Sequence, residues 1–285
     1  MHCKLCNSKN IQPIEELEYE GLVYTMIFCN SCYLLYCLEH HHVVSPDYVN
    51  LDSLDIDAKR IWCQGHHKVS AYKQWNKNFK YMSQAKDHPM RLLDIGCGTG
   101  GFLEHSQKSE FVLYGFDASN AQSEYARKRF PNVRHASSCS EYLDKHGDQN
   151  LLFDVVTMWD VLEHIRNPLD YLREMRRVVR PGGLIYISTP NGLAKLWKRK
   201  LYKLLLLDID CGGEFMPWEH VFYYSPRSLK FLLSLSGFKV LKIGTVPCYR
   251  RALSLFEVAR RLLFWGVRKF PSKAFQIDVW ASAQE

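Results

Sequence analysis

The stretch "RLLDIGCGTGGFL", residues 91–103, decides the fold. An apolar run leads into a cluster of glycines, and a second apolar pattern begins directly after it. This order predicts a buried strand, a tight ligand-binding loop and the start of a helix. The backbone amides of such a loop, together with those that open the following helix, favour an anionic group.

Strands and helices alternate from this loop onward. The apolar segments "FVLYGFD", "NVRHA", "FDVVTMWD" and "GGLIYISTP" predict strands, and amphipathic segments such as "PLDYLREMRRVVR" predict helices between them. Strands that are apolar throughout indicate a parallel sheet covered on both faces. We therefore expect an α/β fold with a doubly wound, mostly parallel seven-stranded sheet of Rossmann-like type. Its ligand should bind beyond the carboxyl ends of the strands.

The composition is that of a globular protein: 285 residues, of which 47% are hydrophobic and 24% charged. No apolar stretch reaches the roughly 18 residues that cross a bilayer, so we expect no transmembrane segment. The N-terminus "MHCKLCNSKN" lacks the apolar core of a secretory signal, and we expect a cytoplasmic protein. The net charge of +7 suits an acidic surface or ligand but does not by itself indicate nucleic-acid binding.

Four of the ten cysteines form two pairs near the N-terminus, Cys3-x-x-Cys6 and Cys29-x-x-Cys32. Each pair can offer two thiolates to one ion, and two pairs complete a tetrahedral four-sulfur site. The segment between them predicts strands that bring the pairs together. Because so small a module has little core of its own, we expect structural Zn²⁺ there. Incidental thiols or a redox Cys-x-x-Cys pair are the alternatives.

Three regions follow from these patterns. They are a zinc-ribbon-like module at residues 1–50, a helical linker or lid at 51–88, and the α/β domain at 89–285 with insertions at 192–222 and 247–271. Aromatic residues of the linker, Trp75 and Phe79 among them, are expected to pack on the following domain.

The glycine cluster fits two kinds of ligand. Gly96-x-Gly98-x-x-Gly101 matches a dinucleotide fingerprint, whereas Gly96-x-Gly98-x-Gly100 preceded by Asp94 suggests S-adenosylmethionine. A carboxylate at position 94 would repel a pyrophosphate but suits a ligand that carries an ammonium and a sulfonium. Other predicted strands also end in acids, which would surround a cationic sulfur. We therefore expect S-adenosylmethionine as the cofactor.

Those acids are Asp117, Asp160 and Glu163. Because the carboxyl ends of parallel strands meet in one crevice, they should line the same site. Asp117 could accept hydrogen bonds from the ribose hydroxyls of either ligand, so it does not distinguish the two.

The motifs "LLDIGCGTGGFL", "YGFDAS", "FDVVTMWDVLEHI", "LREMRRVVRPGGLIYISTPN" and "LLSLSGFKV" occur in this order over residues 89–246. Together they resemble class I S-adenosylmethionine-dependent methyltransferases, most closely the branch with an Asp-Val-Leu-Glu-His element that includes ubiquinone-biosynthesis O-methyltransferases. The resemblance implies that the glycines approach the methionine part, that Asp117 binds the ribose, and that Trp159 and Asp160 line the methyl-donor site. The expected cofactor-binding residues are Asp94, Gly96, Cys97, Gly98, Gly100, Asp117, Ala118, Ser138, Cys139, Trp159 and Asp160.

The adenine contact departs from the family pattern. Many members have an acid after the third strand, where this chain has Ser138 and Cys139, so backbone and a hydroxyl are expected there instead. Cys97 and Cys139 are expected to be small packing residues rather than nucleophiles.

Two histidines are candidates for the base that removes a proton from the acceptor. His164 ends the "DVLEH" element beside the predicted methyl group, and His220 lies in "MPWEHVFYYS", where this fold places acceptor contacts. Histidine suits proton removal near neutral pH. A structural role in orienting the loop is the alternative for His164.

Two basic amphipathic segments, residues 192–208 and 250–269, fall in the insertions. The first, drawn as a helix, places Ala194 and Trp197 on one apolar face. Such helices can lie on anionic lipid at the inner face of a membrane, or they can pack on their own protein. Both interpretations stay open.

The sequence therefore predicts a methyltransferase for a small or lipid-linked hydroxylated metabolite or glycan, methylated on O or C. The alternatives are a zinc-module RNA methyltransferase and a non-catalytic binding protein with this fold. Nucleic acid is disfavoured because residues 1–36 contain only Lys4 and Lys9 as lysines or arginines.

Overall fold

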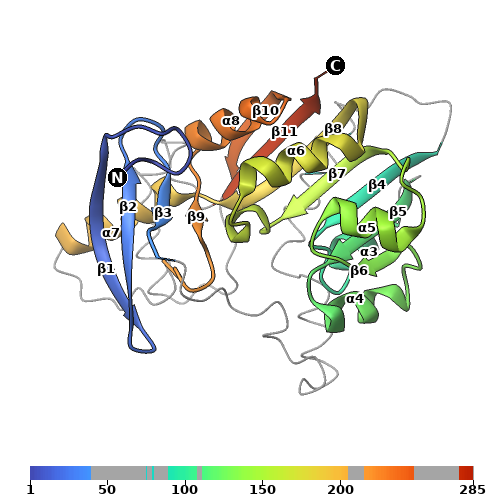
Figure 1. The fold of residues 1–285 in the computed structure, drawn as a ribbon, viewed down its shortest axis with the longest axis horizontal. Coiled ribbons are helices and arrows are strands. Elements are labelled where there is room, and N and C mark those ends of the chain that lie inside the picture. The colour runs from blue at the N-terminus through green and yellow to red at the C-terminus, as the bar shows by residue number, and fades with distance from the viewer. Residues whose placement is uncertain are drawn as a thin grey trace, which may run out of the picture.

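The computed structural model describes residues 1–39, 75, 79, 89–107, 111–204, 215–246 and 276–284. They form a four-stranded sheet that begins at the N-terminus and a seven-stranded sheet flanked by helices (Figure 1). Within these ranges, no helix is both long enough and apolar enough to cross a membrane.

The larger sheet has the strand order β10-β11-β8-β7-β4-β5-β6. Its strands are β4 (Met90–Ile95), β5 (Phe111–Asp117), β6 (Val133–His135), β7 (Phe153–Trp159), β8 (Val179–Pro190), β10 (Phe238–Val246) and β11 (Gln276–Ala283). Strands β6, β5, β4, β7 and β8 pair in parallel, and β11 pairs antiparallel with both β8 and β10. The predicted doubly wound, mostly parallel seven-stranded sheet is confirmed. Its order reverses at β4, which makes the end of β4 the switch point where ligands bind in such folds.

Among the described residues, five helices connect or flank the strands of this sheet. They are α3 (Gly101–Ser106), α4 (Asn120–Arg127), α5 (Cys139–His146), α6 (Pro168–Val178) and α8 (Pro226–Leu235). Ser225 begins α8 with a reciprocal hydrogen-bond pair to Ser228, and Pro226 takes the first helical position, where its missing N–H costs nothing. Helix α6 ends two residues earlier than the amphipathic pattern predicts, because Val179 pairs with Phe153 as the start of β8.

The core lies between β7 and the helices that cover it. All seven residues of β7 are buried, as expected for a strand enclosed on both faces. Leu172, Met175 and Val178 of α6 are buried in the same core, on the apolar face that the sequence predicts.

Two residues of the expected linker, Trp75 and Phe79, are described, and both are buried. Their rings stack with centroids 5.1 Å apart, and Trp75 lies 5.7 Å from the ring of Trp280 on β11. These two aromatics pack on the α/β domain as expected. Most of residues 51–88, and residues 40–50 of the expected module, lie outside the described residues, and the domain boundaries stay a prediction.

The smaller sheet contains β1 (Ile11–Tyr19), β2 (Leu22–Cys29) and β3 (Leu35–Cys37), all antiparallel. The strands expected between the two cysteine pairs are therefore present. The fourth strand, β9 (Phe222–Tyr223), comes from the far end of the sequence and pairs with β3. Figure 1 shows β9 beside the N-terminal strands, at the end of the molecule that also carries α7 (Gly192–Leu204).

Candidate active site and metal centres

The glycine loop turns sharply at the end of β4. Gly96, Gly98 and Gly100 have φ angles of 67°, 52° and 87°, the left-handed region that favours glycine. A Cβ on Gly96 would lie 2.3 Å from Cγ2 of Val161, a distance that no side chain can occupy. The loop therefore needs glycine at this position for both conformation and space.

Two carboxylates lie at the strand ends beside the loop, and one of them bonds the loop directly. Asp117, at the end of β5, accepts hydrogen bonds from the backbone N–H groups of Gly98 (2.7 Å) and Ser119 (2.8 Å). Asp94, at the end of β4, is buried and accepts a hydrogen bond from Oγ1 of Thr157 on the neighbouring β7 (2.7 Å). The two predicted acids thus lie on adjacent strands at the switch point.

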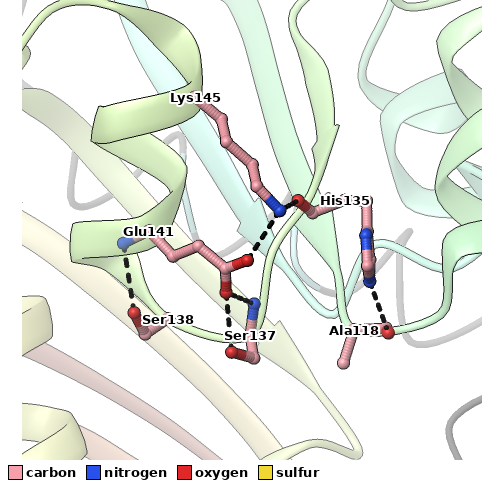
Figure 2. A network of polar contacts seen from close by, with 6 residues as sticks. All are labelled: Ala118, His135, Ser137, Ser138, Glu141 and Lys145. Carbon is pink, nitrogen blue, oxygen red and sulfur yellow. Dashed lines mark hydrogen bonds and ion pairs between the residues drawn. The ribbon is translucent and has the colours of Figure 1, made fainter.

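The predicted adenine region lies at the start of α5. Ser138 is the N-cap residue of this helix, and its hydroxyl accepts a hydrogen bond from the Glu141 N–H (3.2 Å; Figure 2). Glu141 bonds the amide and hydroxyl of Ser137 and the Lys145 ammonium, and these contacts lower its carboxyl pKa to about 2. The hydroxyl expected to contact adenine therefore also caps a helix.

The neighbouring Ala118 belongs to the same region. Its carbonyl lies 3.1 Å from Nε2 of His135 (Figure 2). This contact joins the loop after β5 to the end of β6.

The two cysteines of the predicted cofactor site are buried. Burial raises the pKa of the Cys97 and Cys139 thiols well above the ordinary value, so both stay neutral. A neutral buried thiol is a poor nucleophile, which agrees with the expected packing role.

The predicted methyl-donor residues lie at the end of β7. The Trp159 ring packs between Phe102 and Tyr186, with centroids at 4.9 and 4.6 Å. Asp160 adopts a φ of 54°, unusual for a residue other than glycine, and accepts a hydrogen bond from the side-chain amide of Gln276 on β11. This strained conformation is held at the same edge of the sheet as the glycine loop.

The two candidate bases are brought together from distant parts of the sequence. His164 ends the short 3-10 helix η3 (Leu162–His164) directly after β7, and His220 precedes β9. Their rings lie 4.7 Å apart at 75°. Glu163 lies beside them. One carboxylate oxygen of Glu163 and one ring nitrogen of each histidine, atoms that could bind a metal ion, all lie within 4.8 Å of one another.

The cluster's protonation follows from burial. Glu163 is 1% exposed, and desolvation with the nearby Asp160 charge raises its carboxyl pKa to about 7. Desolvation, followed by the charges of His164 and Lys195, lowers the pKa of His220 to about 3, so its ring is neutral. The Glu219 carbonyl lies 2.8 Å from Nδ1 of His164 and can only accept, so Nδ1 carries the proton.

Two polar atoms in this cluster lack a hydrogen-bond partner among the described residues. They are Oε1 of Glu163 and Nδ1 of His220, both buried. Oε2 of Glu163, by contrast, accepts from Thr189 (2.8 Å). Buried polar atoms of this kind need a ligand, water or ion, and a carboxylate with two imidazoles is a donor set that suits a divalent metal ion.

The four N-terminal cysteines converge as the sequence predicts. The Sγ atoms of Cys3 and Cys32, and those of Cys6 and Cys29, are 3.6 Å apart, and all four lie within 4.8 Å of one another. A tetrahedral zinc site with bonds of about 2.3 Å separates its sulfurs by about 3.8 Å. The four thiols therefore fit one zinc ion.

The backbone on each side of this cluster is built alike. The Asn7 N–H donates to the Cys3 carbonyl (3.0 Å) and the Tyr33 N–H to the Cys29 carbonyl (2.9 Å). Asn7 and Tyr33, each directly after the second cysteine of a pair, adopt left-handed φ angles of 56° and 62°. Two matching turns thus present the two pairs of thiols.

Sequence reasoning missed two parts of the site. The sequence predicts Glu163 only as one acid of the crevice, and its position against both histidines follows from the return of the chain at residue 220. Gln276 holds Asp160 from the last strand, where no motif marks it. A pattern of spacing could not reveal either contact, because each joins segments more than 50 residues apart.

A glycine loop at the switch point, with acids at the neighbouring strand ends, defines a Rossmann-like cofactor-binding protein. A family model described as "Methyltransferase domain" matches residues 66–243. The chain belongs to this methyltransferase family, and its resemblance to class I S-adenosylmethionine-dependent methyltransferases is confirmed.

Named relatives agree with this assignment. The ubiquinone biosynthesis O-methyltransferases of Roseobacter denitrificans and Ruegeria pomeroyi are 35% and 36% identical over 157 residues. Each match covers 52% of this chain and 59% of the relative, so the chain spans about three fifths of their length. A solved methyltransferase from Archaeoglobus fulgidus has a TM-score of 0.52 at 21% identity, over 78% of this chain and 97% of its own, which shows the common fold.

Proposed function

We propose that the chain transfers the methyl group of S-adenosylmethionine to a small or lipid-linked hydroxylated metabolite or glycan, on oxygen or carbon. The observation that carries the proposal is the cluster of buried Glu163 and His220 with half-buried His164, which follows Trp159 and Asp160 in the chain. It provides proton-accepting groups directly after the strand that ends at the expected methyl-donor site. Membership of the methyltransferase family and the names of the relatives support the choice of reaction.

The cofactor would be held by the loop and by the strand ends around it. The residues proposed to bind it are Asp94, Gly96, Cys97, Gly98, Gly100, Asp117, Ala118, Ser138, Cys139, Trp159 and Asp160. When bound, S-adenosylmethionine supplies a methyl group on a good leaving group. The protein must then orient the acceptor in line, exclude water and take a proton.

His164 is the better base of the two histidines. Its Nδ1 proton is held by the Glu219 carbonyl, which leaves the Nε2 lone pair to accept the proton of an acceptor hydroxyl. His220 has a pKa lowered to about 3 by burial, which makes it a weak base. We therefore assign His220 to shaping and polarising the acceptor side.

The four thiols of Cys3, Cys6, Cys29 and Cys32 would hold structural Zn²⁺. All four positions of a tetrahedral ion would be filled by protein, so this metal would have no open position for substrate. Its contribution would be to hold the two cysteine turns together.

A membrane contact through α7 is a narrower part of the proposal. Ala194 is buried, whereas Trp197, one turn further along the helix, is 58% exposed, so the protein covers only part of the apolar face that the sequence suggests. The apolar side at Ala194 and Leu196 packs on the protein itself, and Trp197 with the exposed Lys200 faces outward. An exposed tryptophan beside lysines suits the interface of an anionic membrane. The second segment, 250–269, lies outside the described residues.

Methyl-labelled S-adenosylmethionine tests the reaction. The protein is incubated with separate pools of lipid extract, soluble metabolites, glycans and RNA, with Asp117→Ala as the inactive control. The unmodified protein should transfer label to the lipid, metabolite or glycan pool, and Asp117→Ala should transfer none. Label in RNA alone would contradict the proposed acceptor class. A protein that does not bind the cofactor would instead be a non-catalytic member of the fold.

A further inference from the structure

The cysteine module shares a sheet with the segment that carries His220. Strand β3 of the module pairs with β9, and β9 begins two residues after His220. The Cys37 N–H donates to the Val221 carbonyl (3.1 Å), so the pairing reaches the residue directly after this histidine. The sheet of the predicted N-terminal module is thus completed by β9, a strand of the segment 216–225 that carries His220 and is proposed to contact the acceptor.

Several hydrogen bonds, linked by short stretches of chain, connect the turn of Cys29 and Cys32 to the histidines. The Cys29 N–H donates to the carbonyl of Leu34 (2.9 Å), the residue directly before β3. Beyond the β3–β9 pair, the Val221 N–H donates to the Glu163 carbonyl (2.9 Å). Nδ1 of His164 then bonds the carbonyl of Glu219.

Side chains from the same two parts reinforce this connection. The Ser225 hydroxyl donates to the carbonyl of Cys32 (3.5 Å), and the Arg227 guanidinium lies over the Tyr33 ring at 4.9 Å. The Trp218 ring stacks on Tyr19 with centroids 4.0 Å apart. Residues on both sides of His220 therefore rest on the module.

The paired strands are too short to hold this arrangement alone. Strand β3 has three residues and β9 has two, and such short pairings are marginal without support. Strand β3 also pairs with β2, and the β2–β3 connection is the turn that carries Cys29 and Cys32. A metal that joins this turn to the turn of Cys3 and Cys6 would fix β3, and through it β9.

We propose that metal binding by Cys3, Cys6, Cys29 and Cys32 positions the acceptor side of the active site, by fixing β9 and with it His220 and the Glu219 carbonyl that orients His164. The cysteines are thus positioning residues. This inference rests on the proposed function for its catalytic meaning. The structural coupling itself can be tested without an acceptor.

The test compares Cys3→Ser and Cys32→Ser with Cys37→Ser. Cys37 is a buried thiol of the same module, on β3, but it lies outside the metal cluster, and serine keeps its hydrogen bond to Glu39. Bound zinc, amide hydrogen exchange and affinity for S-adenosylmethionine are measured on each full-length protein.

We expect the two ligand variants to lose zinc and to exchange at least tenfold faster over residues 216–225. In these two variants, the amide exchange rates of β7 and the affinity for S-adenosylmethionine should stay within twofold of those of the unmodified protein. Cys37→Ser should match the unmodified protein in every measurement. Unchanged exchange at 216–225 in a zinc-free variant would overturn the inference. So would equal loss of protection in β7, since the metal would then support the whole fold.

Failure of the proposed function has a different signature. A zinc-loaded protein that does not bind S-adenosylmethionine would refute methyl transfer, whatever the exchange at residues 216–225. The two results can therefore be told apart.

Discussion

The rings of His164 and His220 are in contact, with centroids 4.7 Å apart, and Nδ1 of His164 donates a hydrogen bond to the carbonyl of Glu219, 55 positions further along the chain and directly before His220. The contact gives the two rings different roles. One ring has its tautomer fixed by a carbonyl, and the other is kept neutral by burial. An asymmetric pair of this kind predicts unequal effects when each ring is removed.

His164→Ala should lower turnover by about 10²–10⁴-fold, the usual contribution of a general base. His220→Ala should cost less, because its lowered pKa disfavours proton uptake. Both variants should keep their affinity for S-adenosylmethionine. Turnover is followed with the acceptor pool that gains label, and His146→Ala, on α5, is the matched control. Full activity in both active-site variants would exclude a histidine base.

Glu163→Gln should stabilise the protein at high pH. The folded carboxyl has a pKa of about 7, above its ordinary value of 4.5, so ionisation is disfavoured in the folded state. The protonated Glu163 contributes its full share of the folding stability below pH 4.5, and this contribution is lost as the pH rises through 7. Glutamine stays neutral and can still accept from Thr189. The melting temperatures of the two proteins should agree near pH 4.5, and the variant should melt higher at pH 8.

A lower melting temperature of Glu163→Gln at pH 8, the opposite of the expected change, would point to a bound cation. If Glu163→Gln lowers the melting temperature there, the carboxylate is stabilised by a cation held with His164 and His220. Adding Zn²⁺ or Mg²⁺ to both proteins separates the two cases, because only the unmodified protein should then gain stability.

The sheet and the glycine loop were predictable because their signals are local. The loop and its acids follow apolar runs, and the rules for parallel sheets bring strand ends together. The cysteine cluster was predictable for the same reason, since two Cys-x-x-Cys pairs determine the ligand set. The β3–β9 pairing was not, because the two residues of β9 carry no periodic pattern. Nor was the outward position of Trp197, since spacing on a helix does not say which face meets the protein.

Gly96→Ala should abolish binding of S-adenosylmethionine and destabilise the fold. The new Cβ would meet Val161 at 2.3 Å in a left-handed conformation that alone costs about 1–2 kcal/mol. Gly147→Ala is the matched control: its φ is 84°, and nothing lies within 4 Å of the added Cβ. Gly147→Ala should lower the free energy of unfolding only by the cost of the left-handed conformation, and it should bind S-adenosylmethionine normally. Urea unfolding and calorimetric titration measure the two effects, and equal losses in both variants would rule out the steric argument.

Trp197→Ala should weaken binding to anionic liposomes at least fivefold if α7 lies on a membrane. The ring is 58% exposed, and burying an aromatic side chain in the interface contributes about 1.5–3 kcal/mol. Val23→Ala, an apolar residue 50% exposed on the cysteine module, is the control for general surface effects. Sedimentation with vesicles of anionic and of neutral lipid measures the binding, and raising the salt should weaken it because the attraction is partly electrostatic. Equal sedimentation of both variants, or none of the unmodified protein at low salt, would leave α7 as a helix that serves only to pack against Phe215 and Tyr223.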